Sequence, residues 1–486
     1  MPRLIATPLP VLLLASLLTS CAAGPGYRPA LRQEPAPATF VAATPAVAAT
    51  GEVVDDWWKL YRDPALDQLV QEALVANTDL RIAAANLARA RAVLGESRAG
   101  LYLPSTQLGA SVLEGRSASA NAAAAAQGLK AHAVGTDTAS FSASYELDLF
   151  GRLRRGVQAS RADAEAAAAA LDLARVAVAA DTARAYAEAC AYGEAVAAAR
   201  RSRDIAHQTD EITRTRRTLG AASEFDAARA NALARQSDAA VPALEAQRNA
   251  VLFTLSVLTG RAPEMVIASA KACVRAPALE SPTPVGDGAA LLRRRPDVRI
   301  AERQLAADTA RVGVATAALF PTITLGGQIA GAGATPDKAT ALSGTTFSVG
   351  PVLSWNVPNI AVARARVSQA SAQARASLAR LDGVVLNALR EVETALGNLD
   401  GERQRNGALL AARDQFAAAE ALAKARYDQG AASFLELLDA QRSLQSADAD
   451  LAASDLRKAD AEIALFKALG GGWASAPRVV EHGTKG

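Results

Sequence analysis

The sequence predicts a mainly helical protein that also carries four membrane β-strands and is built from two tandem repeats. Three observations lead to this fold class. Half of the residues are hydrophobic but only 4% are aromatic, and much of the apolar share is alanine, which favours long, closely packed helices. A Gly-Ala-Ala-Ser turn occurs twice, starting at Gly220 and at Gly430, an offset of 430 − 220 = 210 residues. Four segments of about ten residues alternate apolar and polar side chains, which is the period of a β-strand.

Residues 1–20 have the pattern of a secretory signal peptide. Arg3 supplies the positive start, and Leu9–Leu18 form an apolar run of about ten residues, roughly half of what a membrane-spanning helix needs. The run ends in Leu-Thr-Ser-Cys21, which resembles the bacterial lipobox and predicts cleavage before Cys21, lipidation of its thiol and a lipidated segment over 21–64. An ordinary signal peptide with an incidental cysteine is the alternative. No later segment offers about eighteen uncharged apolar residues, so any further membrane crossing must use β-strands.

The repeats have the same order of parts. In each, a first helix (about 65–100 and 296–318) runs into a proline, two strands follow, and a very long helix, the Gly-Ala-Ala-Ser turn and a returning helix complete the unit. The predicted domains are repeat 1 at 65–260, a proline-containing linker at 261–290, repeat 2 at 291–470 and a C-terminal tail at 471–486.

The strands are predicted at about 104–114, 138–150, 321–331 and 345–356. Each has the length that a tilted transmembrane strand needs, although a half-buried sheet in a soluble domain shows the same alternation. Four strands cannot close a barrel, since the smallest membrane barrels have about eight, and open edges are unfavourable in lipid. Membrane insertion would therefore require two, three or four subunits to share one barrel, and the alternation does not choose among them. The polar faces, predicted to line a water-filled pore, include Gln107, Ser140, Ser142, Ser144 and Gln328.

The long helices are predicted at 152–217 and 223–258 in repeat 1 and at 360–427 and 433–468 in repeat 2. Some sixty-five residues at ~1.5 Å each reach on the order of 100 Å, far beyond a globular domain. In each turn the glycine suits the left-handed position after a helix, and Ser223 or Ser433 suits the N-cap of the next one. The pattern predicts two sharp helical hairpins, although a coiled-coil spacer would show it as well.

Composition and motifs argue against nucleic-acid binding and catalysis. Lys and Arg total 52 against 49 Asp and Glu, a net charge of only +3, whereas a nucleic-acid-binding protein needs a clustered basic excess. The three histidines are scattered, and no metal-protease, phosphate-loop or nucleophile-elbow motif is present, so we predict no enzyme, no metal and no cofactor beyond the lipid on Cys21. Cys190 and Cys273 could pair in an oxidising compartment, but nothing in the sequence brings them together, and we expect both to be free packing residues.

Six motifs in chain order resemble the TolC-like outer-membrane factors of tripartite efflux pumps, in the lipoprotein branch of OprM and NodT. The resemblance covers nearly the whole chain after Cys21. It rests on residues 21–29, on 57–66 with Asn77, on Tyr145–Arg152, on Leu292–Asp297 with Ala301 and Glu302, on 426–444, and on the ending Lys467–Trp473. One departure is visible, because the second strand-to-helix passage contains Pro358 and Asn359 where the first has Gly151 and Arg152.

The resemblance implies a homotrimer that forms a twelve-stranded outer-membrane β-barrel, four strands per protomer, continued by a periplasmic α-helical barrel. It implies an exit duct for drugs or other small toxic solutes, fed by an inner-membrane RND transporter through a periplasmic adaptor. Ala22, rather than Asp, after the lipid cysteine favours the outer membrane. Residues expected at the adaptor-docking tips are Arg217, Gly220, Ser223, Asp428, Gly430 and Ser433.

A resting tunnel must close, and in a threefold assembly each inward carboxylate occurs three times and forms a ring. Asp414 and Glu420, before the second turn, are the candidate gate residues, although both could simply be solvated. Two other functions remain open at this level. One is a duct of another secretion system, and the other is a lipid-anchored periplasmic coiled-coil scaffold.

Overall fold

The computed structural model describes residues 23–29, 39–49, 51–116, 118–279, 281–333, 344–355, 357 and 360–479. The chain divides into two units, and several long helices contribute residues to both. The sheet unit comprises Met1–Pro29, Ala88–Ala166 and Glu302–Arg380, and the helical unit comprises Ala30–Leu87, Ala167–Ala301 and Leu381–Gly486.

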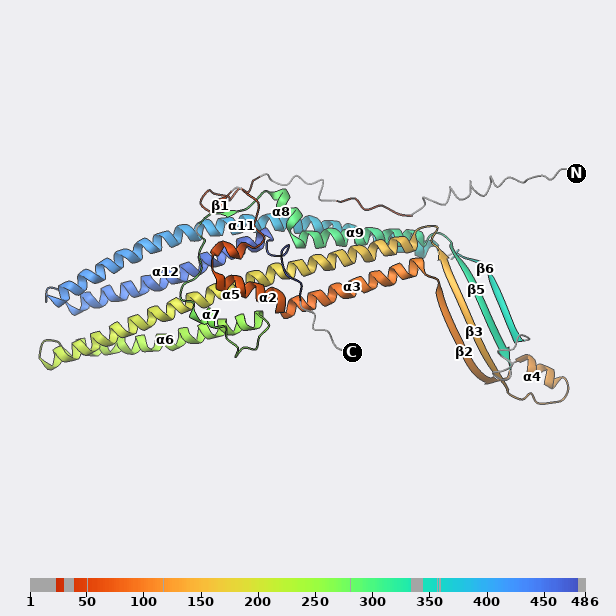
Figure 1. Ribbon diagram of the computed structural model, residues 1–486, viewed down its shortest axis with the longest axis horizontal. Helices are drawn as coiled ribbons and strands as arrows, with labels where there is room; N and C mark the ends of the chain where they lie inside the picture. Colours follow the sequence, from red (N-terminus) through yellow and green to blue (C-terminus); the bar gives the residue numbers. More distant parts are fainter. Residues whose placement is uncertain are drawn as a thin grey trace. The chain divides into compact units, whose positions relative to one another are not determined.

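The sheet unit contains a four-stranded antiparallel sheet in the order β2-β3-β5-β6 (Figure 1). Its strands are β2 (Ser105–Gly115), β3 (Val134–Leu147), β5 (Thr322–Gly333) and β6 (Thr345–Ser354). The central pair, β3 and β5, joins the two halves of the chain.

The connection between β2 and β3 contains a short helix, α4 (Ala118–Ala125), which the sequence analysis did not anticipate (Figure 1). The helix forms because six of its eight residues are alanine, which has the highest helix propensity.

Helices α3 (Thr78–Tyr102), α5 (Arg152–Thr218), α9 (Pro296–Ala317) and α11 (Ile360–Asp428) adjoin the strands. The passage from β3 to α5 turns at Gly151, whose φ of +78° is a conformation that favours glycine. The Asp148 carboxylate accepts hydrogen bonds from the amides of Leu153 and Arg154, both at 2.9 Å, and so caps the first turn of α5. These contacts give Asp148 and Gly151 of this motif a structural role.

In the helical unit, the helix predicted at about 65–100 is two helices, α2 (Pro64–Ala76) and α3. Asn77 separates them. Its side-chain oxygen accepts from the Asp79 amide at 2.8 Å, and its side-chain nitrogen donates to the Leu258 carbonyl at 3.0 Å. The break therefore anchors the start of α3 to the end of α6 (Glu224–Leu258).

The largest core of the helical unit is built around Trp57 in the 3₁₀ helix η2 (Trp57–Tyr61), which stacks on Phe466 of α12 (Phe434–Leu469) with ring centroids 4.8 Å apart. The predicted linker is structured. It contains α7 (Ala268–Ala272), α8 (Gly288–Arg294) and β4 (Thr283–Pro284), and β4 pairs in parallel with β1 (Ala48–Ala49).

Within the described residues, no helix combines the length and the apolar character that a membrane-spanning helix requires.

Candidate functional site

The strand register sorts the sheet into an apolar face and a polar face. Leu108, Phe141, Ile329 and Phe347 face one another in one row across all four strands. The adjacent row, on the opposite face, consists of Gln107, Ser142, Gln328 and Ser348. The apolar row is open in the single chain, since Leu108 is 82% and Phe347 80% exposed. An apolar patch of this kind is unfavourable in water and suits lipid or another subunit.

The sheet also has two open edges. β2 pairs only with β3 among the described strands, and β6 pairs only with β5, so each outer strand presents one row of backbone N–H and C=O groups without a ladder partner. Backbone groups without a hydrogen-bond partner are unfavourable in free energy when they face lipid. A strand of another subunit can supply the missing hydrogen bonds.

The first hairpin tip joins α5 to α6. Gly220 has a φ of +74°, its amide donates to the Arg217 carbonyl at 2.9 Å, and the next amide donates to the Arg216 carbonyl at 2.8 Å. These are the two hydrogen bonds of a Schellman motif. Ser223 and Asp226 form a reciprocal capping box at the start of α6. Arg217 binds the Glu224 carboxylate at 2.8 Å across the same turn.

The second tip joins α11 to α12 and repeats this geometry. Gly430 has a φ of +75° and its amide donates to the Tyr427 carbonyl at 3.0 Å. The Ser433 hydroxyl accepts from the Glu436 amide at 3.2 Å. Asp428 pairs with Lys424 at 3.2 Å, one turn back along α11. The predicted tip residues therefore lie in two matching turns, and all except Asp428, which pairs within α11, contribute to the geometry of their own turn.

A cation–π contact near the tips joins the two hairpins, and it involves a residue that the sequence analysis did not single out. The Arg216 guanidinium of α5 lies over the Tyr427 ring of α11, with its carbon 4.4 Å from the ring centroid. Tyr427 also contacts Phe434 at the start of α12, at 6.0 Å between centroids. Tyr427 belongs to the motif at 426–444 that carries the family resemblance, but no local sequence pattern indicates its partner on another helix.

The structure does not bring the two gate candidates together. Six residues separate Asp414 from Glu420, which turns an α-helix by roughly 240°, so they lie on different faces of α11. Asp414 pairs with Arg413 at 3.2 Å, and Arg413 also binds Asp448 of α12 at 2.9 Å. Glu420 lines a groove of about 170 Å³ between the helices, together with Leu233 and Arg442.

The described N-terminal segment lies in the sheet unit. The Ala23 amide donates to the Phe150 carbonyl at 3.0 Å, next to the turn between β3 and α5. A Cβ on Gly24 would stand 2.6 Å from the Cα of Gly313 in α9, so glycine allows this close approach. The Tyr27 hydroxyl then donates to Glu302 at 3.0 Å. Residues 1–20 and Cys21 lie outside the described residues, but Ala23 fixes the chain two residues beyond that cysteine.

The remaining motifs hold the ends of helices in the helical unit. The Asp55 carboxylate accepts from the backbone amides of residues 472–475, the closest being Ser475 at 2.7 Å. Burial raises the pKa of Asp55, but these hydrogen bonds and that of the Ser475 hydroxyl outweigh it, and the net pKa is lowered. Arg294 and Arg295 donate to the last carbonyls of α12, those of Leu469 and Ala468, both at 2.8 Å.

In the described part of the chain, no three His, Cys, Asp or Glu side chains are grouped closely enough to hold a metal ion.

A sequence model of the outer membrane efflux protein family matches residues 69–261 and 289–471. The chain belongs to this family. Nodulation protein T of Rhizobium leguminosarum bv. trifolii is 31% identical over 461 residues, which are 94% of this chain and 96% of that protein. The pyoverdine export outer membrane protein OpmQ of Pseudomonas putida is 32% identical over 90% of this chain and 94% of its own length. The outer-membrane channel OprN has a solved structure that matches with a TM-score of 0.82 and 33% identity, covering 93% of this chain and 100% of that one.

The resemblance to TolC-like outer-membrane factors is confirmed. This outer membrane efflux protein is a mainly helical channel component of the outer membrane and not an enzyme. The family model matches one stretch in each half of the chain, on either side of the linker.

Proposed function

We propose that three copies of this chain assemble into one outer-membrane exit duct. β6 of each copy would pair with β2 of the next, giving a closed barrel of twelve strands, four from each protomer. The observation that carries this proposal is the four-stranded sheet with two open edges and an exposed apolar face. Closure supplies partners to both edges, and lipid covers the apolar row. The polar row, Gln107, Ser142, Gln328 and Ser348, would then line the pore.

The number three comes from the resemblance to the TolC-like channels, since the open edges are equally compatible with two or four copies. In the trimer, the helices would continue the barrel as a periplasmic tunnel. The two tandem repeats would supply equivalent parts of its wall, which the matching tip turns at Gly220 and Gly430 support.

The lipid anchor on Cys21 is part of the proposal. Ala23 is held at the turn between β3 and α5, where the sheet ends. An acyl chain attached two residues before Ala23 would therefore start at the boundary of the proposed barrel, where an outer-membrane leaflet would accept it.

The hairpin tips are the proposed contact for a periplasmic adaptor, which would connect the duct to an inner-membrane RND transporter. The docking residues proposed are Arg217, Gly220, Ser223, Asp428, Gly430 and Ser433.

Asp414 and Glu420 are the proposed gate residues, and the two would have different roles. Asp414 is 58% exposed at its side chain and could form a carboxylate ring, whereas Glu420 lines the groove between helices. Drugs and other small toxic solutes are the proposed cargo.

The test is electron imaging of the lipidated protein extracted from outer membranes, with its native mass measured in parallel. We expect a hollow particle with threefold averages and a mass of three mature chains. A particle with two or four copies would overturn the stoichiometry, and a monomer that stays soluble without detergent would overturn the duct.

The cargo is tested by deleting the gene, which should raise the sensitivity of the cells to several unrelated drugs. Unchanged sensitivity together with loss of one secreted product would identify a different cargo.

A further inference from the structure

The helical unit contains a disulfide that the proposed channel does not use. Cys190 in α5 is bonded to Cys273, which follows α7, across a sequence separation of 83 residues. Our expectation that both cysteines are free was wrong, because the tertiary fold brings the linker onto α5 and no local pattern indicates this. Cys190 is fully buried in the core around Tyr186 and Leu252, whereas Cys273 is partly exposed.

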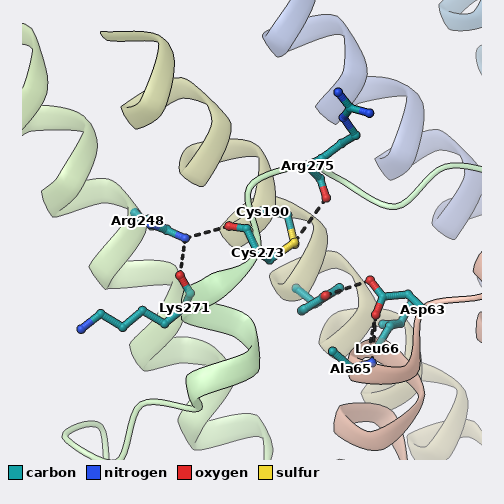
Figure 2. The surroundings of a disulfide bond; sticks show 9 residues. Asp63, Ala65, Leu66, Cys190, Arg248, Lys271, Cys273 and Arg275 are labelled. Atoms are coloured by element: carbon teal, nitrogen blue, oxygen red, sulfur yellow. Dashed lines mark hydrogen bonds between the residues drawn. A yellow bond between two sulfur atoms is a disulfide. The ribbon is translucent and has the colours of Figure 1, made fainter. Parts of the chain in front are cut away.

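Two further contacts hold the linker against α5 and α6. A Cβ at Gly193, three residues after Cys190 on α5, would stand 2.4 Å from the Cys273 carbonyl oxygen, so the linker backbone occupies the space of a side chain. Arg248 of α6 donates to the carbonyls of Lys271 and Cys273, both at 2.7 Å (Figure 2). The end of α7 is thus held by α5 through a covalent bond and by α6 through a guanidinium.

The same packing closes the access to Cys190. Disulfide exchange requires a thiolate and an in-line approach to the sulfur that it attacks. With the linker docked, Cys190 has no exposed surface and Arg248 holds the Cys273 carbonyl, so we expect a mixed disulfide between Cys273 and another protein to require an undocked linker.

We propose that a thiol–disulfide oxidoreductase of the oxidising compartment outside the cytoplasm oxidises this chain before the linker docks, and that the resulting bond clamps residues 261–279 onto the α5–α6 hairpin. The Cys273 thiolate attacks the disulfide of the oxidoreductase, which forms a mixed disulfide and releases one enzyme thiolate. The Cys190 thiolate then attacks the Cys273 sulfur and releases the second enzyme thiolate. Two cysteine protons are given up, two electrons pass to the oxidoreductase, and it leaves as a dithiol. An outer-membrane protein crosses such a compartment during export.

The first test measures the clamp in the assembled protein by hydrogen exchange. In the double variant Cys190→Ala, Cys273→Ala, amides of residues 261–279 should exchange about tenfold faster or more, while those of α2 keep their rate. Equal exchange in the linker of variant and wild type would overturn the clamp. Channel conductance in lipid bilayers is measured on the same samples, so a failure of the proposed duct is a separate result.

The second test addresses the order of oxidation and docking. Gly193→Ala should leave the Cys190–Cys273 bond formed, as seen by mass mapping of linked peptides, but should speed linker exchange, because the added methyl blocks docking and not oxidation. Gly156→Ala is the matched control in the same helix, since a Cβ there meets no atom within 4 Å. A reduced Gly193→Ala protein would show that docking precedes oxidation and overturn the proposed order.

The third test addresses the oxidoreductase. In cells that lack their exported thiol oxidase, the linked peptide should fall at least about tenfold, and adding the oxidised enzyme to the unfolded chain should restore it. Equal amounts of linked peptide with and without the oxidase would overturn the enzymatic step.

Discussion

A charge placed on the apolar face of the sheet should prevent assembly, whereas the same charge on the neighbouring residue should not. Val349 is the fifth of ten residues in β6 and is 75% exposed. It lies on the same face as the apolar row, in the neighbouring row formed with Gly327, Ala143 and Thr106. Ten residues at ~3.3 Å span about 33 Å, which a tilt of about 40° reduces to ~25 Å, the height of the apolar band of a membrane barrel. Val349 therefore lies near the middle of the bilayer in the proposed barrel.

An arginine at the bilayer midplane on the lipid face costs roughly 2–4 kcal/mol per copy. Three copies in the proposed trimer bring the cost of Val349→Arg to roughly 6–12 kcal/mol, comparable with the whole stability of a domain. Ser348 lies one residue away on the polar face, so Ser348→Arg faces water in the proposed pore and should cost little. The two substitutions therefore lie on opposite faces of β6 but at nearly the same depth in the bilayer.

The assay is the fraction of heat-resistant oligomer in outer membranes, together with a urea titration of the extracted protein in lipid. We expect Val349→Arg to abolish the oligomer and Ser348→Arg to retain it with altered conductance. Retention of the oligomer by Val349→Arg, or equal loss in both variants, would refute the assignment of the two faces.

Three other perturbations probe the helical unit. Arg216→Ala should remove its cation–π contact with Tyr427, which is worth about 0.5–1 kcal/mol at an exposed site. The frequency of channel openings in lipid bilayers should then rise about two- to fivefold. An unchanged frequency would exclude this contact from gating. Gly430→Ala should destabilise its turn by about 1–2 kcal/mol because of the positive φ. Gly401→Ala, in the middle of α11, should instead stabilise that helix by about 0.5–1 kcal/mol. Hydrogen exchange at the tip should be faster in the first variant and not in the second. Asp55→Asn should lower stability at neutral pH by about 1–2 kcal/mol through weakened charge-assisted hydrogen bonds. Because the folded state lowers the pKa of Asp55, its contribution is complete above the ordinary value of 3.8 and is lost as the pH falls below it; thermal unfolding should lose this part of its acid dependence in the variant.

Local patterns were sufficient where a residue acts on its own neighbours. The serine N-caps and the left-handed glycines of both tips follow from steric and hydrogen-bonding rules within a few residues, and the structure has both. Local patterns failed where the outcome depended on composition or on a distant partner. The alanine run at 118–125 formed a helix, and the predicted first helix broke at Asn77 because its amide reaches the carbonyl of Leu258, which lies far along the chain.

Short-range patterns were enough to identify the family, the apolar and polar faces of each strand, and the two helical hairpins, because each pattern is formed by residues close together in the chain. Which distant residues come into contact follows from the folded chain alone. It paired β3 with β5 and so aligned Phe141 with Ile329, placed Arg216 over Tyr427, and joined Cys190 to Cys273. Such contacts depend on the path of the whole chain through space, and residues that are far apart in sequence carry no local pattern that names their partner.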